Sequence, residues 1–189
     1  MQKTAKRSLS FSDIRRLIPF LIFIVAVIVS IITTWHVTGH ILDSDASSEM
    51  VLAHQLSKSH SILSRDWLYS TELRVLNSQL FFSFFFHCFE NWHLVRFFSA
   101  VTLQALMILG YSYMLKKTDF QWQNIWIGSA MLLLPASVTY GRVILYHSHY
   151  IVHLCLAFFI IGTIAETAKE FSFKSTIILT IVNWNVTLA

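Results

Sequence analysis

Charged residues are scarce in this sequence. They make up 13% of the chain, whereas a typical soluble domain carries roughly 25%. Hydrophobic residues make up 55% and form runs too long for a water-exposed surface, which excludes an ordinary soluble protein. The pattern predicts an all-α integral membrane protein, a polytopic bundle of transmembrane helices with interfacial helices in its first outer loop.

Proline, glycine and cysteine are also rare. With two prolines and five glycines, the chain has few helix breakers. It also lacks the pair of interrupted spans that would favour a transporter. The two cysteines, Cys88 and Cys155, lie in apolar surroundings without metal-ligand spacing. Buried free thiols are favoured over a disulfide or a reactive site.

Positive charge is concentrated at the N-terminus. Five of the 14 basic residues lie within the first 16 positions, ahead of an uncharged run over residues 17–34. The positive-inside rule places this N-terminus in the cytoplasm. No basic stripe interleaved with aromatic residues follows, so nucleic acid is not an expected partner. The run is longer than a signal-peptide core of about 7–15 residues, which favours an uncleaved anchor.

Five apolar runs predict membrane spans within a single membrane domain, residues 1–189. The last run is short for a bilayer and has no charged anchor after it, so the sequence is expected to be truncated. Lys116 and Lys117 close the second span on the cytoplasmic side, and membrane lipid is the expected surrounding. The predicted spans are residues 17–34, 97–115, 122–138, 150–165 and 175–189.

The predicted first outer loop, residues 35–92, holds six of the ten acidic residues. Within it, residues 46–57 have the spacing of a short helix, with Ser44 or Asp45 as a natural N-cap. Residues 75–89 contain an apolar core too short to cross, and we expect an interfacial or re-entrant helix there. Residues 139–149 are expected to form a second, short outer loop.

The first outer loop opens with Asp43-Ser44-Asp45. In an extended segment the two carboxylates would point the same way. They could then hold a divalent cation, or one could act as a general base toward a hydroxyl group. A helix N-terminus just after them would favour their ionised form and attract phosphate. Taken alone, the motif more often caps a helix and keeps it solvated.

Several arginines fall on the outer side, against the usual charge bias. Arg96 lies near the start of a span, where it would bind a lipid phosphate or pair with Glu72 or Glu90. A histidine cluster is formed by His147, His149 and His153. The last two share a helical face, but without an evident third ligand we favour hydrogen bonding over metal binding. The outer arginines are Arg65, Arg74, Arg96 and Arg142.

The order of these parts resembles the N-terminal portion of the C-type (GT-C) integral membrane glycosyltransferases. The resemblance rests on the DSD motif, on "NWHLVRFFSAVTLQALMILGYSYMLKK" and on "LLLPASVTYGR". The stretch "EMVLAHQLSKSHSILSRDWLYSTELRVLNSQLFF" is also similar to uncharacterised bacterial membrane proteins of that superfamily. Together the similar segments cover most of residues 15–165.

The resemblance implies sugar transfer from a polyprenyl-phosphate donor to an acceptor on the outer face of a bacterial plasma membrane. Asp43 or Asp45 would be the catalytic carboxylate, and Arg96 matches the arginine at the start of the family's second span. We further expect the donor phosphate to be bound chiefly by Arg96, with Arg74 or Arg142. The chain departs from the family in lacking an acid in the second outer loop, further spans and a C-terminal soluble domain. A non-catalytic membrane protein, or an inactive fragment of such an enzyme, is the alternative.

Overall fold

The structure, a computed structural model, describes residues 11–67, 77–118, 120–147 and 150–169, with side chains from residue 17 to residue 168. Every regular element within these ranges is a helix, as the apolar runs predicted. In chain order the elements are α1 (Phe11–His40), α2 (Ser44–Ser59), α3 (Ser78–Phe86), α4 (Trp92–Lys117), α5 (Trp122–Leu133), α6 (Val138–Tyr140), the π-helix η1 (Gly141–Tyr146) and α7 (Ile151–Lys169).

Three of these helices are long and apolar enough to cross a membrane: Leu17–His40 within α1, all of α4, and Ile151–Ala168 within α7. Their lengths are 24, 26 and 18 residues, and about 20 residues cross a typical hydrocarbon core. A fourth crossing is formed if α5 and the bent segment after it count as one span. The fifth predicted span, residues 175–189, lies outside the described residues.

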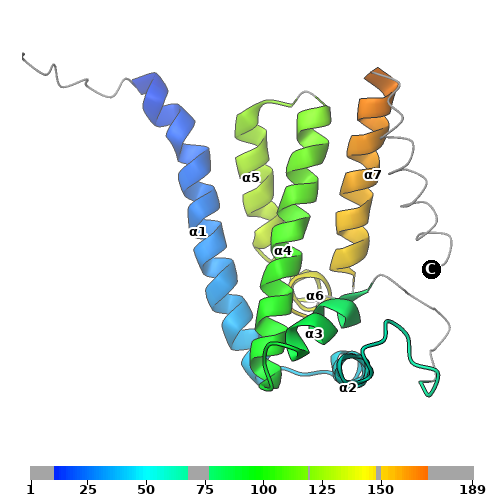
Figure 1. The fold of residues 1–189 in the computed structure, drawn as a ribbon. Helices are drawn as coiled ribbons and strands as arrows, with labels where there is room; N and C mark the ends of the chain where they lie inside the picture. The colour runs from blue at the N-terminus through cyan, green and yellow to red at the C-terminus, as the bar shows by residue number, and fades with distance from the viewer. Residues whose placement is uncertain (1–10, 68–76, 119, 148–149, 170–189) are drawn as a thin grey trace, which may run out of the picture.

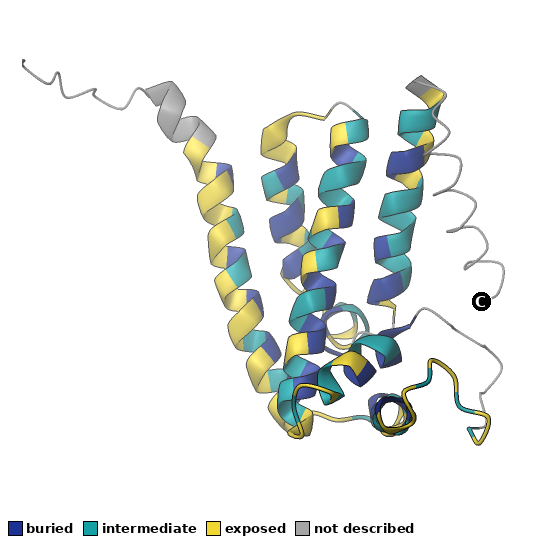
Figure 2. Ribbon diagram, viewed as in Figure 1, coloured by how far each residue is buried: buried dark blue, intermediate teal, exposed yellow. Residues whose placement is uncertain are grey.

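α1 faces the other helices with a stripe of small side chains. Ala26, Ser30, Thr34 and Thr38 follow one another at intervals of four residues, and each is at most 2% exposed. The opposite face carries exposed isoleucine, leucine and valine side chains (Figure 2). Small residues toward the neighbouring helices and large apolar residues outward suit a helix surrounded by lipid. The helix continues to His40, beyond the predicted end of the span at residue 34.

α4 and α7 form the most extensive helix pair among the described elements. Leu103 and Met107 of α4 belong to the same buried cluster as Ile151 of α7. Gly162 of α7 permits the close approach, because a Cβ atom there would come within 3.0 Å of the Met114 Cα atom of α4. The pair therefore relies on the small size of this glycine as well as on apolar packing.

α2 and α3 lie at one end of the helix assembly, called the α2 end below. Figure 1 looks along the axis of α2 and shows α1, α4 and α7 from the side, so α2 runs across the long helices. Met50 of α2, Phe82 of α3 and Val95 of α4 pack in one buried cluster. A 2.5 Å hydrogen bond from Ser78 Oγ to Glu49 Oε2 also joins α3 to α2. Both helices occupy stretches for which the sequence predicts helix.

At the opposite end, called the Lys117 end below, lie the last turns of α4 and α7, and α1 begins at the same end but apart from them (Figure 1). Lys117 Nζ lies 2.5 Å from Glu166 Oε1, and Tyr113 Oη donates a 2.8 Å hydrogen bond to Glu166 Oε2. This ion pair ties α4 to α7. Lys116 and Lys117 thus lie at the end away from the acid-rich segment.

The segment after α4 differs from the straight span predicted over residues 122–138. α5 ends at Leu133, and Leu134 is extended with φ −91° and ψ 128°. Leu134 precedes Pro135, and steric clash with a proline ring disfavours the helical φ/ψ region for the residue before it. After Pro135 the chain turns, and α6 with η1 runs at 89° to α5. Residues 139–146 are therefore helical instead of forming the expected loop. The turn brings η1 into contact with α1, α4 and α7.

Candidate functional site

Asp43 occupies the junction between α1 and α2. Its backbone is extended, with φ −93° and ψ 172°, and its Oδ1 atom accepts a 2.8 Å hydrogen bond from the backbone N–H of Ala46. Asp43 is therefore the N-cap of α2, whereas the sequence favoured Ser44 or Asp45. The helix begins at Ser44, so the residue just before it is the one that reaches the unpaired N–H groups of the first turn.

The other carboxylate oxygen of Asp43 meets two basic side chains, Arg142 from the start of η1 and His147 from the residue just after it. Oδ2 lies 2.5 Å from His147 Nδ1 and 3.8 Å from Arg142 Nη2. The His147 side chain is fully buried, whereas 28% of the Asp43 side chain and 52% of the Arg142 side chain are exposed. The carboxylate thus lies between a buried imidazole and an accessible guanidinium. Asp43, Arg142 and His147 are called the Asp43 cluster below.

The π-helical geometry of η1 explains how Arg142 and His147 reach the same carboxylate. The backbone N–H of His147 donates a 3.0 Å hydrogen bond to the carbonyl of Arg142, five residues back. That is the hydrogen-bond pattern of a π-helix, a rare element that is frequent at functional sites. Its wider turn aligns positions five apart, so both side chains face the α1–α2 junction.

Asp45 does not join this cluster. It lies in the first turn of α2 and is exposed, and its Oδ1 atom has a 3.4 Å contact with the Ser44 hydroxyl. The two carboxylates would point the same way in an extended segment, but the helix begins between them and separates their directions. Within the described residues, no group of three His, Cys, Asp or Glu side chains is placed to hold a metal ion. A divalent cation shared by Asp43 and Asp45 has no support in this geometry.

Arg96 is buried at the start of α4 and binds the end of α1. Its Nη1 donates a 2.6 Å hydrogen bond to the Thr38 carbonyl, and its Nη2 donates a 2.7 Å hydrogen bond to the Ile41 carbonyl. The side chain is only 6% exposed. A cation suits the C-terminal end of a helix, where carbonyl groups lack helical partners. Arg96 thus holds the turn that carries Asp43, whose carboxylate also interacts with it electrostatically.

The remaining predicted site residues fall in different places. Arg74, Glu72 and His149 lie outside the described residues. Glu90 is exposed and is not paired with Arg96, which uses backbone carbonyls as partners. His153 is partly buried in the first turn of α7, and its ring centre lies 6.0 Å from that of Tyr150.

A buried polar network around Gln104 lies between the Asp43 cluster and the Lys117 end. Gln104 Oε1 accepts a 3.0 Å hydrogen bond from Ser30, and its Nε2 donates to the Thr34 hydroxyl (3.0 Å) and the Leu145 carbonyl (3.1 Å). One amide therefore connects α1, α4 and η1. The sequence showed Gln104 only as a polar interruption in an apolar span, and a lone amide in such a span is the signal that could have identified it.

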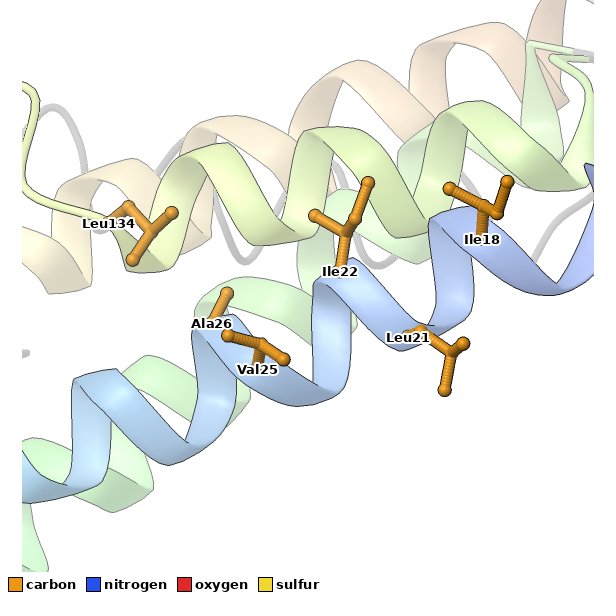
Figure 3. Close-up of a pocket in the computed structure, with 6 residues that line it drawn as sticks. All are labelled: Ile18, Leu21, Ile22, Val25, Ala26 and Leu134. Atoms are coloured by element: carbon orange, nitrogen blue, oxygen red, sulfur yellow. The ribbon is translucent and has the colours of Figure 1, made fainter.

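An apolar pocket of about 310 Å³ opens beside the first half of α1 (Figure 3). It has no ionisable side chain in its lining, and the Asp43 cluster lies beyond the other end of α1. Its lining is entirely apolar, so it offers no side chain for acid–base catalysis. The lining residues are Ile18, Leu21, Ile22, Val25, Ala26 and Leu134.

The comparisons with known proteins give no further guidance: no family model, curated protein or solved structure matches this chain. The Asp43 cluster combines a carboxylate that can accept a proton, an imidazole that fixes its orientation, and an accessible guanidinium that can bind an anion.

Proposed function

We propose that the chain is a polytopic integral membrane protein with the α2 end on the extracytoplasmic face. The spanning helices would be α1, α4, α7 and the bent pair of α5 with η1. The orientation is supported by Lys116 and Lys117, which lie at the opposite end from the acid-rich segment, as the positive-inside rule favours. α2 and α3 would then lie in the headgroup region.

The activity that we propose is sugar transfer from a polyprenyl phosphate to an acceptor hydroxyl at the α2 end. The hydroxyl oxygen would attack the anomeric carbon, and the bond from that carbon to the phosphate oxygen would break. The lipid phosphate leaves with the electron pair, and the hydroxyl proton passes to the Asp43 carboxylate. A general base of this kind contributes about 10²–10⁴ in rate.

Arg142 is the residue best placed to receive the departing phosphate. Its side chain is 52% exposed, and the 3.8 Å contact of Nη2 with Asp43 leaves other N–H groups of the guanidinium available. A guanidinium near a developing phosphate charge stabilises the transition state. Arg96 has a supporting role in this proposal, because two of its nitrogens already bind carbonyls of the α1 end. Arg74 stays a candidate from the sequence alone.

One observation carries the proposal. Asp43 and His147 are 104 positions apart in the sequence, yet their side chains form a hydrogen bond beside an exposed arginine, at the end where α2 and α3 lie. A hydrogen bond from a buried imidazole Nδ1–H to a carboxylate fixes the relative orientation of the two groups, as in the Asp–His pair of the serine-protease triad. Structural capping alone requires neither the imidazole nor the arginine.

A non-catalytic membrane protein, or an inactive fragment of a transferase, is the competing proposal. It is favoured by the engagement of both carboxylate oxygens of Asp43, one with the Ala46 N–H and the other with His147. Such a carboxylate can be purely a joint between α1, α2 and η1. In that case Asp43 would matter for folding, and no sugar donor would be consumed.

The test is consumption of radiolabelled polyprenyl-phosphate sugars by the chain reconstituted in vesicles, with Asp43→Asn compared with Asp45→Asn. Asparagine at either position keeps the shape and, at position 43, the N-cap. We expect Asp43→Asn to lower turnover by about 10²–10⁴ and Asp45→Asn to leave it within a factor of about two, since Asp45 is exposed outside the cluster. Equal turnover in both variants would refute the assigned role. Absence of turnover in the wild type with every donor would favour the non-catalytic alternative.

A further inference from the structure

A second pair of facing side chains lies between α2 and α3, apart from the Asp43 cluster. His60 is the C-cap of α2, and His87 is the C-cap of α3. His87 Nε2 lies 3.3 Å from His60 Nδ1, and the two ring centres are 5.3 Å apart. Both histidines are exposed, so solutes can reach the nitrogens that face each other.

The hydrogen bonding of His87 fixes which of its nitrogens carries the proton. His87 Nδ1 lies 2.8 Å from the Ser83 carbonyl oxygen, which only accepts hydrogen bonds, so Nδ1 carries the hydrogen atom. In the neutral ring the lone pair is then on Nε2, directed at His60. Histidines that bind metals have this arrangement, with the far nitrogen donating to a carbonyl or carboxylate.

The spacing of the two rings fits chelation of one metal ion. Two imidazole nitrogens each about 2.05 Å from a tetrahedral zinc ion would lie roughly 3.3 Å apart, with ring centres about 5.2 Å apart. The observed separations are 3.3 Å and 5.3 Å. If the two nitrogens pointed straight at each other, ring centres about 1.15 Å behind them would be roughly 5.6 Å apart. The two ring centres are therefore not collinear with the facing nitrogens.

The backbone at His60 has an uncommon conformation. His60 has φ 49° and ψ 36°, the left-handed region, and it is the only non-glycine residue with positive φ among those described. Glycine is the usual residue at such a helix end, because a side chain there carries a steric cost. The imidazole at this position faces a histidine 27 positions away on another helix.

We propose that His60 Nδ1 and His87 Nε2 bind one Zn²⁺ ion at the α2 end, with water in the remaining positions. Imidazole nitrogen is a preferred ligand of zinc. No third His, Cys, Asp or Glu joins the pair within the described residues, so the site is open and exchangeable. Without metal, the Nδ1–H of His60 donates to His87 Nε2; with zinc, the His60 proton moves to Nε2 and both facing nitrogens bind the ion. The ion would link the end of α2 to the end of α3.

A matched control pair is present on α1. His36 and His40 are four residues apart, but their ring centres are 6.3 Å apart, and His40 Nδ1 lies 2.8 Å from the His36 carbonyl. That spacing exceeds the one expected for two ligands of a single tetrahedral ion. Both pairs are exposed and contain the same chemical groups, so they share any nonspecific affinity for metal.

The experiment is a calorimetric titration of the intact chain in lipid nanodiscs with Zn²⁺, comparing the wild type with His60→Gly, His87→Gln and the control His40→Gln. We expect one zinc ion per chain with the highest affinity, a loss of about tenfold or more in His60→Gly and in His87→Gln, and no change in His40→Gln. Equal affinity in the wild type and in His60→Gly and His87→Gln would overturn the proposal. An equal loss in His40→Gln would do so as well.

His60→Gly also separates metal binding from folding. Glycine suits the left-handed conformation at position 60, so this variant should unfold at the same temperature as the wild type, or higher, when no metal is present. Zinc should raise the unfolding temperature of the wild type and of His40→Gln but not that of His60→Gly. A zinc-induced rise of equal size in His60→Gly would show that the ion binds elsewhere. The outcome is independent of the transferase proposal, because neither histidine belongs to the Asp43 cluster.

Discussion

Gln104 Nε2 donates a 3.1 Å hydrogen bond to the backbone carbonyl of Leu145, in the last turn of η1. The same amide binds Ser30 and Thr34 of α1, so it fixes η1 against α1 as well as against α4. η1 carries Arg142 and leads directly into His147. Gln104 is therefore a positioning residue for the Asp43 cluster, although it lies within an apolar helix.

Gln104→Leu should destabilise the protein, because Leu145, Ser30 and Thr34 each lose a buried hydrogen-bond partner. Hydrogen bonds between helices in membranes are worth about 0.6 kcal/mol on average. We therefore expect a loss of about 1–2 kcal/mol in the free energy of unfolding, measured by denaturant titration in detergent micelles. Gln123→Leu is the control, since Gln123 is exposed on α5 and its replacement should change stability by less than about 0.5 kcal/mol. Equal effects of the two substitutions would contradict the role of Gln104.

The N-cap and the charge of Asp43 can be separated by two substitutions. Asp43→Ala removes the acceptor for the Ala46 N–H and the partner of His147. The first loss costs about 0.5–2 kcal/mol, and the second leaves a buried donor with one partner fewer, at about 1–3 kcal/mol. Asp43→Asn keeps an oxygen for the cap, so its loss of stability should be clearly smaller. Thermal unfolding followed by circular dichroism measures both, and identical unfolding temperatures for Asp43→Ala and the wild type would exclude Asp43 as the cap.

The sequence predicted those parts of the fold that depend on local pattern. α1, α4 and α7 follow from long apolar runs bounded by charge, and α2 follows from its amphipathic spacing. The prediction for residues 122–138 differs from the structure because hydropathy continues through Pro135, while backbone geometry ends α5 at Leu133. Local pattern thus locates apolar helices well and their ends poorly.

The sequence predicted only part of the candidate site. Asp43 stood out as an acid near a helix start, but its pairing with His147 depends on the bend after α5 and on the π-helical turn of η1. No periodicity links positions 104 residues apart. Arg96 was expected to meet an acid or a phosphate. It donates hydrogen bonds to two carbonyls at the end of α1, and a helix end is an electrostatic partner that a list of charged residues does not show.

Gly162→Ala should weaken the packing of α4 on α7. A Cβ atom at position 162 would come within 2.7 Å of the Tyr113 ring and 3.0 Å of the Met114 Cα atom, and the backbone atom cannot move aside without shifting α4. Overpacking of this kind costs about 1–3 kcal/mol. Gly39→Ala is the matched control, because the atoms nearest to its new Cβ belong to the His93 ring, from 3.2 Å, and not to the backbone, and alanine favours helix. Denaturant titration should show a loss for Gly162→Ala alone, and equal stability of the two variants would contradict the close approach.

The orientation can be tested with a native residue. Cys88 is exposed just after α3, at the α2 end, whereas Cys155 is buried. If the α2 end is extracytoplasmic, a membrane-impermeant maleimide added to intact cells should label the wild-type chain at Cys88, and Cys88→Ser should abolish the label.

The reciprocal probe is placed at the Lys117 end. Lys116 is exposed there, so Lys116→Cys in the Cys88→Ser background should react only after the cells are permeabilised. Labelling of Cys88 only after permeabilisation would place the α2 end in the cytosol. The Asp43 cluster would then face the cytosol. Lys116 and Lys117, at the opposite end, would lie outside, against the positive-inside rule. Transfer from a lipid phosphate at the outer face would be ruled out, because neither Asp43 nor Arg142 could reach such a donor.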